Sequence, residues 1–270
     1  MSGVLEKAMA IVELLFDHPA GLPVSAIAAA TDQPASGVHR TLQELARLGY
    51  VRQAHAQGDY ALSIKLPAMG AGFLSRAGIT DVAQPILDAL AAEVGELVRL
   101  SVVDGDSLTW VGVAQGATHG LRYDAGQEQG VTVHLASSSG GRAWLATMSD
   151  EEALMRVGAQ GLIRTAEGQG PNAPRDPAEL LAALAQARAR GYAVAVDSYI
   201  AGMAAMAVPL RDPGSGRVLG CLSIAGPAVR MTAARMEALA PSLRAAAEEM
   251  AAAVPGSRFF QVEMRTAGAA

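Results

Sequence analysis

The stretch of sequence that decides the fold runs from residue 24 to residue 51 and reads VSAIAAATDQPASGVHRTLQELARLGYV. It predicts a short apolar helix that starts near Ser25, a residue type that commonly caps helices. The following Thr31-Asp32-Gln33-Pro34 is typical of a tight turn, in which Asp tolerates a left-handed backbone. A second helix then ends at Gly49. Its apolar face consists of Val38, Leu42, Leu45 and Leu48.

The residues on either side complete a small domain. Upstream, helical spacing predicts a helix that stops at the breaker cluster of residues 18–21. Its apolar stripe consists of Leu5, Met9, Val12 and Phe16, with Ala8 and Leu15 beside them. Downstream, residues 50–52 and 60–64 are predicted to pair as a hairpin with Gly58-Asp59 near its tip. Three helices and a hairpin predict a winged helix-turn-helix.

The outer face of the predicted third helix is polar and suggests a DNA partner. In this fold such a helix enters the major groove, where Arg and Gln side chains suit purine edges and Ser suits phosphates. The candidate DNA contacts are Ser25, Ser36, Gly37, His39, Arg40, Gln43 and Arg47. Two alternatives stay open. The polar residues could simply be solvated, and His39, which flanks the apolar stripe, could pack instead of contacting DNA.

The charge of the chain excludes a generic polyanion binder. Residues 1–76 carry six basic and six acidic side chains, so the whole net charge of −5 lies in the remainder. DNA binding must therefore come from a few well-placed groups. The composition of 51% hydrophobic and 17% charged residues is that of a globular chain, and 270 residues suffice for one large domain or two small ones.

Cysteine and histidine usage argues against a metal site or a disulfide framework. The single cysteine, Cys221, cannot form an intramolecular disulfide, and the five histidines show no metal-ligand spacing. No charge-free apolar run approaches the roughly 18 residues of a membrane span, and the N-terminus has no signal-peptide pattern. The expectation is a cytoplasmic protein that needs no cofactor and no membrane.

The second half of the chain predicts an α+β domain with an antiparallel sheet, because strands, helices, strands and a final helix follow one another. The predicted strands are 97–103, 108–113, 131–133, 192–196, 203–210 and 218–225, and the predicted helices are 142–148, 151–157, 176–190 and 232–254. Two helices before this domain form a linker of the kind that often serves as a dimer contact, and the domain boundary is expected near residues 76–80. The predicted division is 1–66 (winged helix-turn-helix), 67–95 (linker helices), 96–254 (sheet domain) and 255–270 (tail).

The serine-rich segment Ser137–Gly141 is the best candidate for a ligand site. Small residues and free N–H groups at a helix start can bind an anion, and simple capping of the helix accounts for them equally well. A serine hydrolase would need a base and an acid, for which His134 and Asp197 are available. No nucleophile-elbow pattern surrounds these serines, so the domain is interpreted as a pocket without catalytic residues.

Several segments resemble one known family in order and spacing over roughly residues 4–254. They are Leu5-Glu6-Lys7-Ala8, Val38-His39-Arg40, Leu45, Gly49-Tyr50-Val51, Gly141-Arg142-Ala143, Leu145-Ala146, Gly191-Tyr192-Ala193-Val194, Gly202, Pro209 and Ser223-Ile224-Ala225-Gly226-Pro227. In these the chain resembles the IclR family of bacterial transcriptional regulators. The resemblance implies a winged helix-turn-helix, a linker helix and a GAF-like effector-binding domain. It also implies dimers or tetramers on palindromic double-stranded operator DNA and a small organic acid as effector.

The chain departs from the family pattern at both expected sites. The recognition helix often starts with Lys-Ser-Thr in such proteins, whereas this chain has Ala35-Ser36-Gly37. More of the DNA contact should therefore fall on Ser36 and Arg40. In the effector pocket, an Asp, a Cys and a Ser of many relatives are replaced by Ala195, Ala205 and Ala225.

These alanines suggest a larger, partly apolar effector such as an aromatic acid, because the polar atoms of a very small hydrated acid would stay unpaired. Alternatively, the alanines carry no such meaning and the ligand binds elsewhere in the pocket. The carboxylate of the effector would meet the N–H groups of residues 138–141, and its ring would lie near Trp110. The candidate effector-binding residues are Trp110, Tyr123, Ser137, Ser138, Ser139, Gly140, Gly141, Asp197, Met203, Ala205, Ser223 and Ala225.

The expected function is a ligand-responsive, DNA-binding regulator of a nearby catabolic operon, not an enzyme. Two other classes remain as alternatives. One is a constitutive DNA-binding protein whose larger domain only oligomerises, and the other is a serine hydrolase. Ligand binding without turnover would exclude the hydrolase, and ligand-dependent DNA affinity would exclude the constitutive protein.

Overall fold

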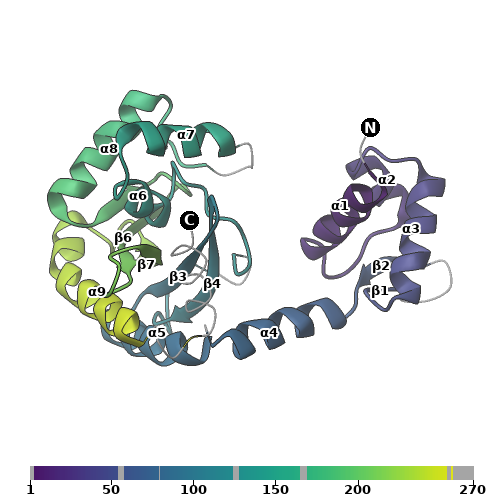
Figure 1. Ribbon diagram of the computed structural model, residues 1–270, viewed down its shortest axis with the longest axis horizontal. Helices are drawn as coiled ribbons and strands as arrows, with labels where there is room; N and C mark the ends of the chain where they lie inside the picture. Colours follow the sequence, from purple (N-terminus) through teal and green to yellow (C-terminus); the bar gives the residue numbers. More distant parts are fainter. Residues whose placement is uncertain are drawn as a thin grey trace. The chain divides into compact units, whose positions relative to one another are not determined.

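A computed structural model describes residues 3–53, 58–78, 80–123, 128–164, 169–253 and 257 of the chain. The chain divides into two compact units, Met1–Leu74 and Ser75–Ala270. Figure 1 labels most of the helices and strands of both. The division falls inside α4 (Lys65–Ala77), which belongs to the predicted linker region.

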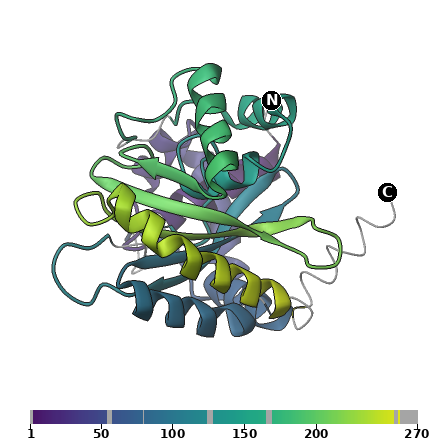
Figure 2. The ribbon, with the colours of Figure 1, turned by 90° about the vertical axis from the view of Figure 1, so that its left-hand side faces the viewer.

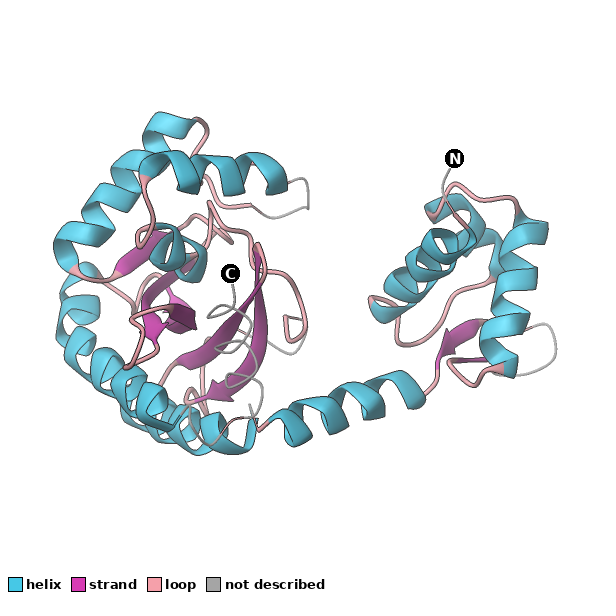
Figure 3. Ribbon diagram, viewed as in Figure 1, coloured by secondary structure: helices cyan, strands magenta, loops and turns pink. Residues whose placement is uncertain are grey.

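The N-terminal unit is the predicted winged helix-turn-helix. It consists of α1 (Val4–Phe16), α2 (Val24–Ala30), α3 (Ala35–Arg47) and the antiparallel strands β1 (Val51–Gln53) and β2 (Tyr60–Leu62), drawn in magenta in Figure 3. Its core is formed by Ile11, Leu15, Ile27, Val38, Leu42, Val51 and Tyr60. Between α2 and α3, Asp32 has a φ of 49°, the left-handed conformation that the turn sequence predicts.

Three details of this unit differ from the prediction. The predicted stripe of α1 is largely exposed, with Leu5 at 75%, because the helix turns Ile11 and Leu15 into the core instead. Both faces of α1 are apolar, so spacing alone does not decide which one packs inward. Ser25 does not cap α2, since the helix begins one residue earlier with Pro23 at the N-cap position. Leu48 follows the last residue of α3 and is 43% exposed.

The C-terminal unit is built on one five-stranded antiparallel sheet in the order β4-β3-β7-β6-β5, which confirms the predicted α+β class. The strands are β3 (Leu97–Asp104), β4 (Ser107–Gln115), β5 (Ala193–Val196), β6 (Met203–Arg211) and β7 (Val218–Pro227). The helices are α5 (Thr80–Val94), α6 (Ser139–Leu145), α7 (Asp150–Gln160), α8 (Pro177–Arg190) and α9 (Ala233–Ala253). The predicted strand 131–133 is wrong: only Thr132 forms an isolated bridge, to Thr109, before the chain turns toward α6.

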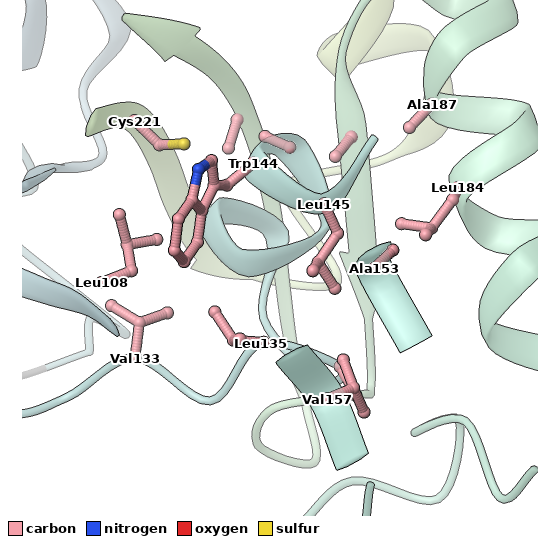
Figure 4. Packing of buried hydrophobic residues seen from close by; sticks show 14 of the residues in the cluster. Leu108, Val133, Leu135, Trp144, Leu145, Ala153, Val157, Leu184, Ala187 and Cys221 are labelled. Carbon is pink, nitrogen blue, oxygen red and sulfur yellow. The ribbon is translucent and has the colours of Figure 1, made fainter. Parts of the chain in front are cut away.

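Helices cover both faces of this sheet. Figure 2 shows α5 and α9 together on one face, with α6, α7 and α8 on the other. Between the sheet and α6–α8 lies a buried hydrophobic cluster in which Trp144 packs with Leu108 and Cys221 (Figure 4). Because the central strands β3 and β7 are covered on both faces, their residues are buried without the alternation of a half-exposed strand.

Arg142 ties α6 to the neighbouring segments. It is 6% exposed and donates hydrogen bonds to the Ala136 carbonyl (2.8 Å), the Val194 carbonyl (2.8 Å) and Ser198 Oγ (2.6 Å). Burial lowers the pKa of Arg142 to about 10, so the guanidinium keeps its charge at neutral pH. One side chain thus fixes the helix start against β5 and the segment that follows it.

Within the described residues, no helix is both long and apolar enough to cross a bilayer. The same residues contain no cluster of three or more His, Cys, Asp or Glu side chains that could hold a metal ion.

Candidate functional site

The outer face of α3 presents most of the candidate DNA contacts together. Ser36, His39, Arg40, Gln43 and Arg47 are exposed along the helix, and Gly37 is partly buried. The opposite face is closed by Val38 and Leu42, both at 0% exposure. Ser25 is exposed on α2, outside this helix.

The two arginines of this face differ in their partners. The side chains of Arg40 and Gln43 make no hydrogen bond or ion pair with any residue that the structure describes. The Arg47 guanidinium instead binds Glu44, with Nε to Oε2 at 2.9 Å and Nη2 to Oε1 at 2.5 Å. This pair raises the pKa of Arg47 and lowers the pKa of Glu44. The Arg40 guanidinium is therefore free to bind a partner, whereas Glu44 partly neutralises the charge of Arg47.

Gly37 leaves open space at the start of α3. A Cβ built on it would meet nothing within 4 Å, so packing does not require glycine there. Residues 54–57 of the predicted hairpin lie outside the described residues. Gly58, near the predicted tip, accepts a hydrogen bond from Gln53 Nε2 at 2.9 Å.

The C-terminal unit contains a small, partly open cavity between the sheet and the start of α6. About 20 Å³ of it is free for the centre of a water molecule, which is room for about one water. Its wall includes six of the residues that the sequence predicts for the effector: Tyr123, Ser138, Ser139, Met203, Ala205 and Ala225. Ala195, Tyr199, Ile200, Arg99 and Glu128 complete it.

A buried ion pair forms the polar side of the cavity. Arg99 on β3 and Glu128 are 6% and 5% exposed, and Nη1 of Arg99 donates to Oε2 of Glu128. The Tyr123 hydroxyl donates to the other carboxylate oxygen at 2.9 Å. Burial and the charge of Glu128 raise the pKa of Tyr123, so it stays a donor. Arg99 Nε is buried and has no hydrogen-bond partner among the described residues.

Two aromatic rings, Trp110 and Tyr199, pack next to the Arg99–Glu128 pair. The Arg99 guanidinium carbon lies 4.7 Å from the centre of the Trp110 ring, an arrangement that favours the cation. Trp110 meets Tyr199 edge to face at 5.5 Å, and the Arg164 guanidinium lies 4.3 Å from the Tyr199 ring. Trp110 thus lies behind Arg99 and is not part of the cavity wall.

The remaining predicted effector residues lie around the cavity without lining it. Ser223 pairs with Arg99 across β3 and β7 and donates to its carbonyl at 3.3 Å. Asp197 has a φ of 48° and accepts the Gly202 N–H at 2.6 Å, which closes a turn. A Cβ on Gly140 would meet ordinary core neighbours, and one on Gly141 would lie 2.4 Å from the Leu135 backbone.

The serine segment holds a helix cap and a buried pair. Ser138 Oγ accepts the Gly141 N–H at 3.0 Å, so its side chain caps α6. Ser137 Oγ lies 2.8 Å from His134 Nδ1, but Ser137 is 0% exposed and does not line the cavity. Burial lowers the pKa of His134. A hydrolase nucleophile would need access to substrate, which Ser137 lacks in this position.

Sequence reasoning missed Arg99 and Glu128. The available signal is Arg99 itself, a lone charge within the apolar strand sequence LVRLSVV of residues 97–103. A charged residue in a strand covered on both faces requires a buried partner. Glu128 lies outside the strands, so no spacing rule connects it to Arg99.

Comparison with known proteins gives matches over most of the chain. The model of the IclR helix-turn-helix domain matches residues 4–55, and the model of the bacterial transcriptional regulator IclR C-terminal domain matches residues 71–252. The Pca regulon regulatory protein of Pseudomonas putida is 27% identical over 86% of this chain and 77% of its own length. The HTH-type transcriptional regulator BhcR of Paracoccus denitrificans is 29% identical over 87% of this chain and 81% of its own.

Solved structures share the fold. An IclR homologue from Microbacterium hydrocarbonoxydans, crystallised in complex with 4-hydroxybenzoate, has a TM-score of 0.71 at 23% identity. The superposition covers 94% of this chain and 100% of that one. At this identity the likeness shows the architecture alone.

Proposed function

The chain belongs to the IclR family of bacterial transcriptional regulators, and from this premise we propose that it senses a small aromatic acid and controls a nearby catabolic operon. The observation that carries the proposal is the cavity of the C-terminal unit, whose lining combines a buried guanidinium with apolar side chains. A carboxylate suits the Arg99 guanidinium, and a ring suits the methyl and thioether groups opposite it.

Three alanines support an aromatic effector over a small hydrated one. Ala195, Ala205 and Ala225 all line the cavity and offer methyl groups in place of polar atoms. A short keto acid would leave its oxygens facing these methyls without partners, at an energetic cost. One relative is named for the Pca regulon, and the structure of another homologue contains 4-hydroxybenzoate, so aromatic acids form the first panel of compounds to test.

DNA binding is assigned to the outer face of α3. Ser36, Arg40 and Gln43 are the leading contacts, because they are exposed and lie opposite the buried face of the helix. Arg40 and Gln43 are free to reach base edges or phosphates. Gly37, His39 and Arg47 flank them on α3, and Ser25 belongs to the preceding helix.

Self-association into dimers or tetramers is part of the proposal. Two helices expose large apolar side chains: Val4, Leu5, Met9 and Phe16 on α1, and Met69 and Phe73 on α4. Such surfaces are unfavourable in water, and a second copy of the chain would cover them. A symmetric dimer also matches a palindromic operator, in which each recognition helix meets one half-site.

The test is fluorescence anisotropy of the full chain on its own upstream intergenic DNA and on a scrambled duplex, across a salt series. Each titration is repeated with benzoate, 4-hydroxybenzoate, pyruvate and glyoxylate. The expected result is sequence-selective binding that an aromatic acid changes and a short keto acid does not. Binding that only pyruvate or glyoxylate alters would overturn the aromatic effector.

A constitutive DNA-binding protein with an oligomerisation domain is the second candidate. The small free volume of the cavity favours it, because nothing of ligand size fits without rearrangement. It predicts sequence-selective binding that no acid of the panel alters. The same titrations therefore separate the two candidates.

A further inference from the structure

The cavity carries no net charge and has little free space. Arg99 and Glu128 are the ionised side chains among the described residues of its wall, and their charges cancel. The free volume, about 20 Å³, holds roughly one water. An aromatic acid would bring a ring that is larger than the free volume and a negative charge that no free cation of the wall compensates. A negatively charged side chain must therefore move out of the site when the acid enters.

Of the two charged residues, Arg99 is the fixed one. It lies on β3, which is paired on one side with β4 and on the other with β7. Its guanidinium is supported by the Trp110 ring. Glu128 belongs to no strand and opens a turn in which its carbonyl accepts the Val131 N–H at 3.0 Å. The Glu128 side chain is therefore carried by a turn, whereas Arg99 is carried by a strand that is paired on both sides, and its guanidinium is held against the Trp110 ring.

Arg99 also has unused capacity to bind a carboxylate. Its contact with Glu128 uses Nη1, while Nε is buried without a partner. A guanidinium can give two parallel hydrogen bonds to one carboxylate, and such paired bonds are stronger and more directional than a single bond. Within a guanidinium, Nε forms such a fork with Nη2, so a carboxylate placed in the cavity could bind Arg99 through these two nitrogens.

We propose that the effector enters by exchange: its carboxylate replaces the Glu128 carboxylate on the Arg99 guanidinium. The Glu128 carboxylate then occupies the position of the ligand carboxylate and neutralises the charge of the buried Arg99 guanidinium. The inference rests on the proposed organic-acid function and narrows it to monocarboxylates with an apolar body. A dicarboxylate would add a second buried charge for which the described wall offers no cation.

Calorimetric titration of the full chain tests the exchange with a charged and an uncharged probe, 4-hydroxybenzoate and 4-hydroxybenzamide. Glu128→Gln keeps the shape of the side chain and removes its charge. We expect this variant to bind 4-hydroxybenzoate at least about tenfold more tightly than the wild type, because a competing carboxylate is gone. Its affinity for the amide should stay unchanged. Glu152→Gln is the matched control, since Glu152 accepts from Arg156 at 3.3 Å outside the cavity wall.

Chemical rescue gives a second readout that does not depend on the identity of the effector. Glu128→Ala leaves the buried Arg99 without its counter-charge and should lower the melting temperature. Benzoate should raise that temperature by several degrees more in Glu128→Ala than in the wild type or in Glu152→Ala. If Glu128→Ala does not fold, the same melts are run on Glu128→Gln.

Two results would overturn the exchange, and they differ in what else they remove. If the wild type binds aromatic acids and Glu128→Gln binds them equally or more weakly, Glu128 is not displaced, while the acid-sensing function stands. If neither the wild type nor any Glu128 variant binds or is stabilised by a carboxylate, the exchange and the proposed effector class fall together.

Discussion

Replacing Arg40 by alanine is expected to separate the proposed DNA recognition by α3 from folding. The side chain is exposed and makes no hydrogen bond or ion pair with the described residues, so its removal breaks no interaction within the domain. The core residues Val38 and Leu42 lie on the opposite face of α3. The variant should therefore unfold at the same temperature as the wild type, to within a degree or so.

The expected loss of affinity follows from the kind of contact that a free guanidinium makes. An arginine bound to a guanine edge contributes about 1–3 kcal/mol, which corresponds to about 5- to 150-fold in affinity for each half-site. If Arg40 binds a phosphate instead, the loss of affinity is similar on every DNA sequence. The negative slope of log affinity against log salt concentration then becomes shallower by about one for each half-site. Anisotropy on operator and scrambled DNA distinguishes these cases.

Arg47 and Glu44 supply the matched controls. Arg47→Ala removes a guanidinium that Glu44 already holds through two nitrogens, so it should weaken binding less than Arg40→Ala. Glu44→Gln removes an anion from the same face and should strengthen binding. If Arg40→Ala binds the operator as tightly as the wild type, or if it loses cooperative unfolding, the assignment of this helix face is wrong.

Four further changes test the packing, protonation and assembly of the protein. Arg142→Met removes the donor of three hydrogen bonds, two of them to buried residues, and should destabilise the fold by about 3 kcal/mol in denaturant titration. A loss below about 1 kcal/mol would contradict the role of this side chain. Gly141→Ala places a Cβ 2.4 Å from the Leu135 backbone and should cost about 1–3 kcal/mol in the same assay, whereas an unchanged midpoint would mean that α6 shifts freely. Burial lowers the pKa of His134, so the contribution of this residue to stability is present above the unfolded-state pKa of about 6.5 and is lost as the pH falls through the folded-state pKa. His134→Asn should therefore make the free energy of unfolding depend less on pH in this range. An equally steep pH dependence would exclude His134 as its source. Phe73→Lys charges the exposed face of α4 and should shift the mass measured by light scattering toward the monomer; an unchanged mass would remove this face from the self-association surface.

The winged helix-turn-helix could be predicted because its signals are local. The turn needs a left-handed residue and has Asp32, and the apolar face of α3 recurs at helical spacing around Val38 and Leu42. The orientation of α1 could not be predicted in the same way. Its two faces are both apolar, and only the fold decides that Ile11 and Leu15 face inward while Leu5 and Phe16 remain exposed.

The polar half of the cavity was beyond local reasoning for a different reason. Arg99 and Glu128 are 29 positions apart, and their contact arises only when residues 128–131 lie along β4, where Gly130 and Val131 are hydrogen-bonded to Trp110. The apolar half is predicted through the family resemblance, which places Ala205 and Ala225 where many relatives have a Cys and a Ser, and in the structure these two residues pair across β6 and β7. Residues of one strand face share a cavity by geometry, whereas a charge pair between a strand and a turn depends on the tertiary path of the chain.

The exchange at Arg99 would also explain how a ligand in this cavity changes the conformation of the protein. A ligand biases an equilibrium only through contacts that differ between its two states. The turn that begins at Glu128 is hydrogen-bonded to β4, with the Gly130 N–H to the Trp110 carbonyl at 2.8 Å and the Trp110 N–H to the Val131 carbonyl at 3.2 Å. The Glu128 side chain also anchors this turn to Arg99 on β3. An effector that takes its place on Arg99 removes that second anchor, so the free energy of binding is coupled to the position of the turn. A ligand that bound beside an intact Arg99–Glu128 pair would lack this coupling, which makes displacement of Glu128 the step that distinguishes an effector from an inert occupant.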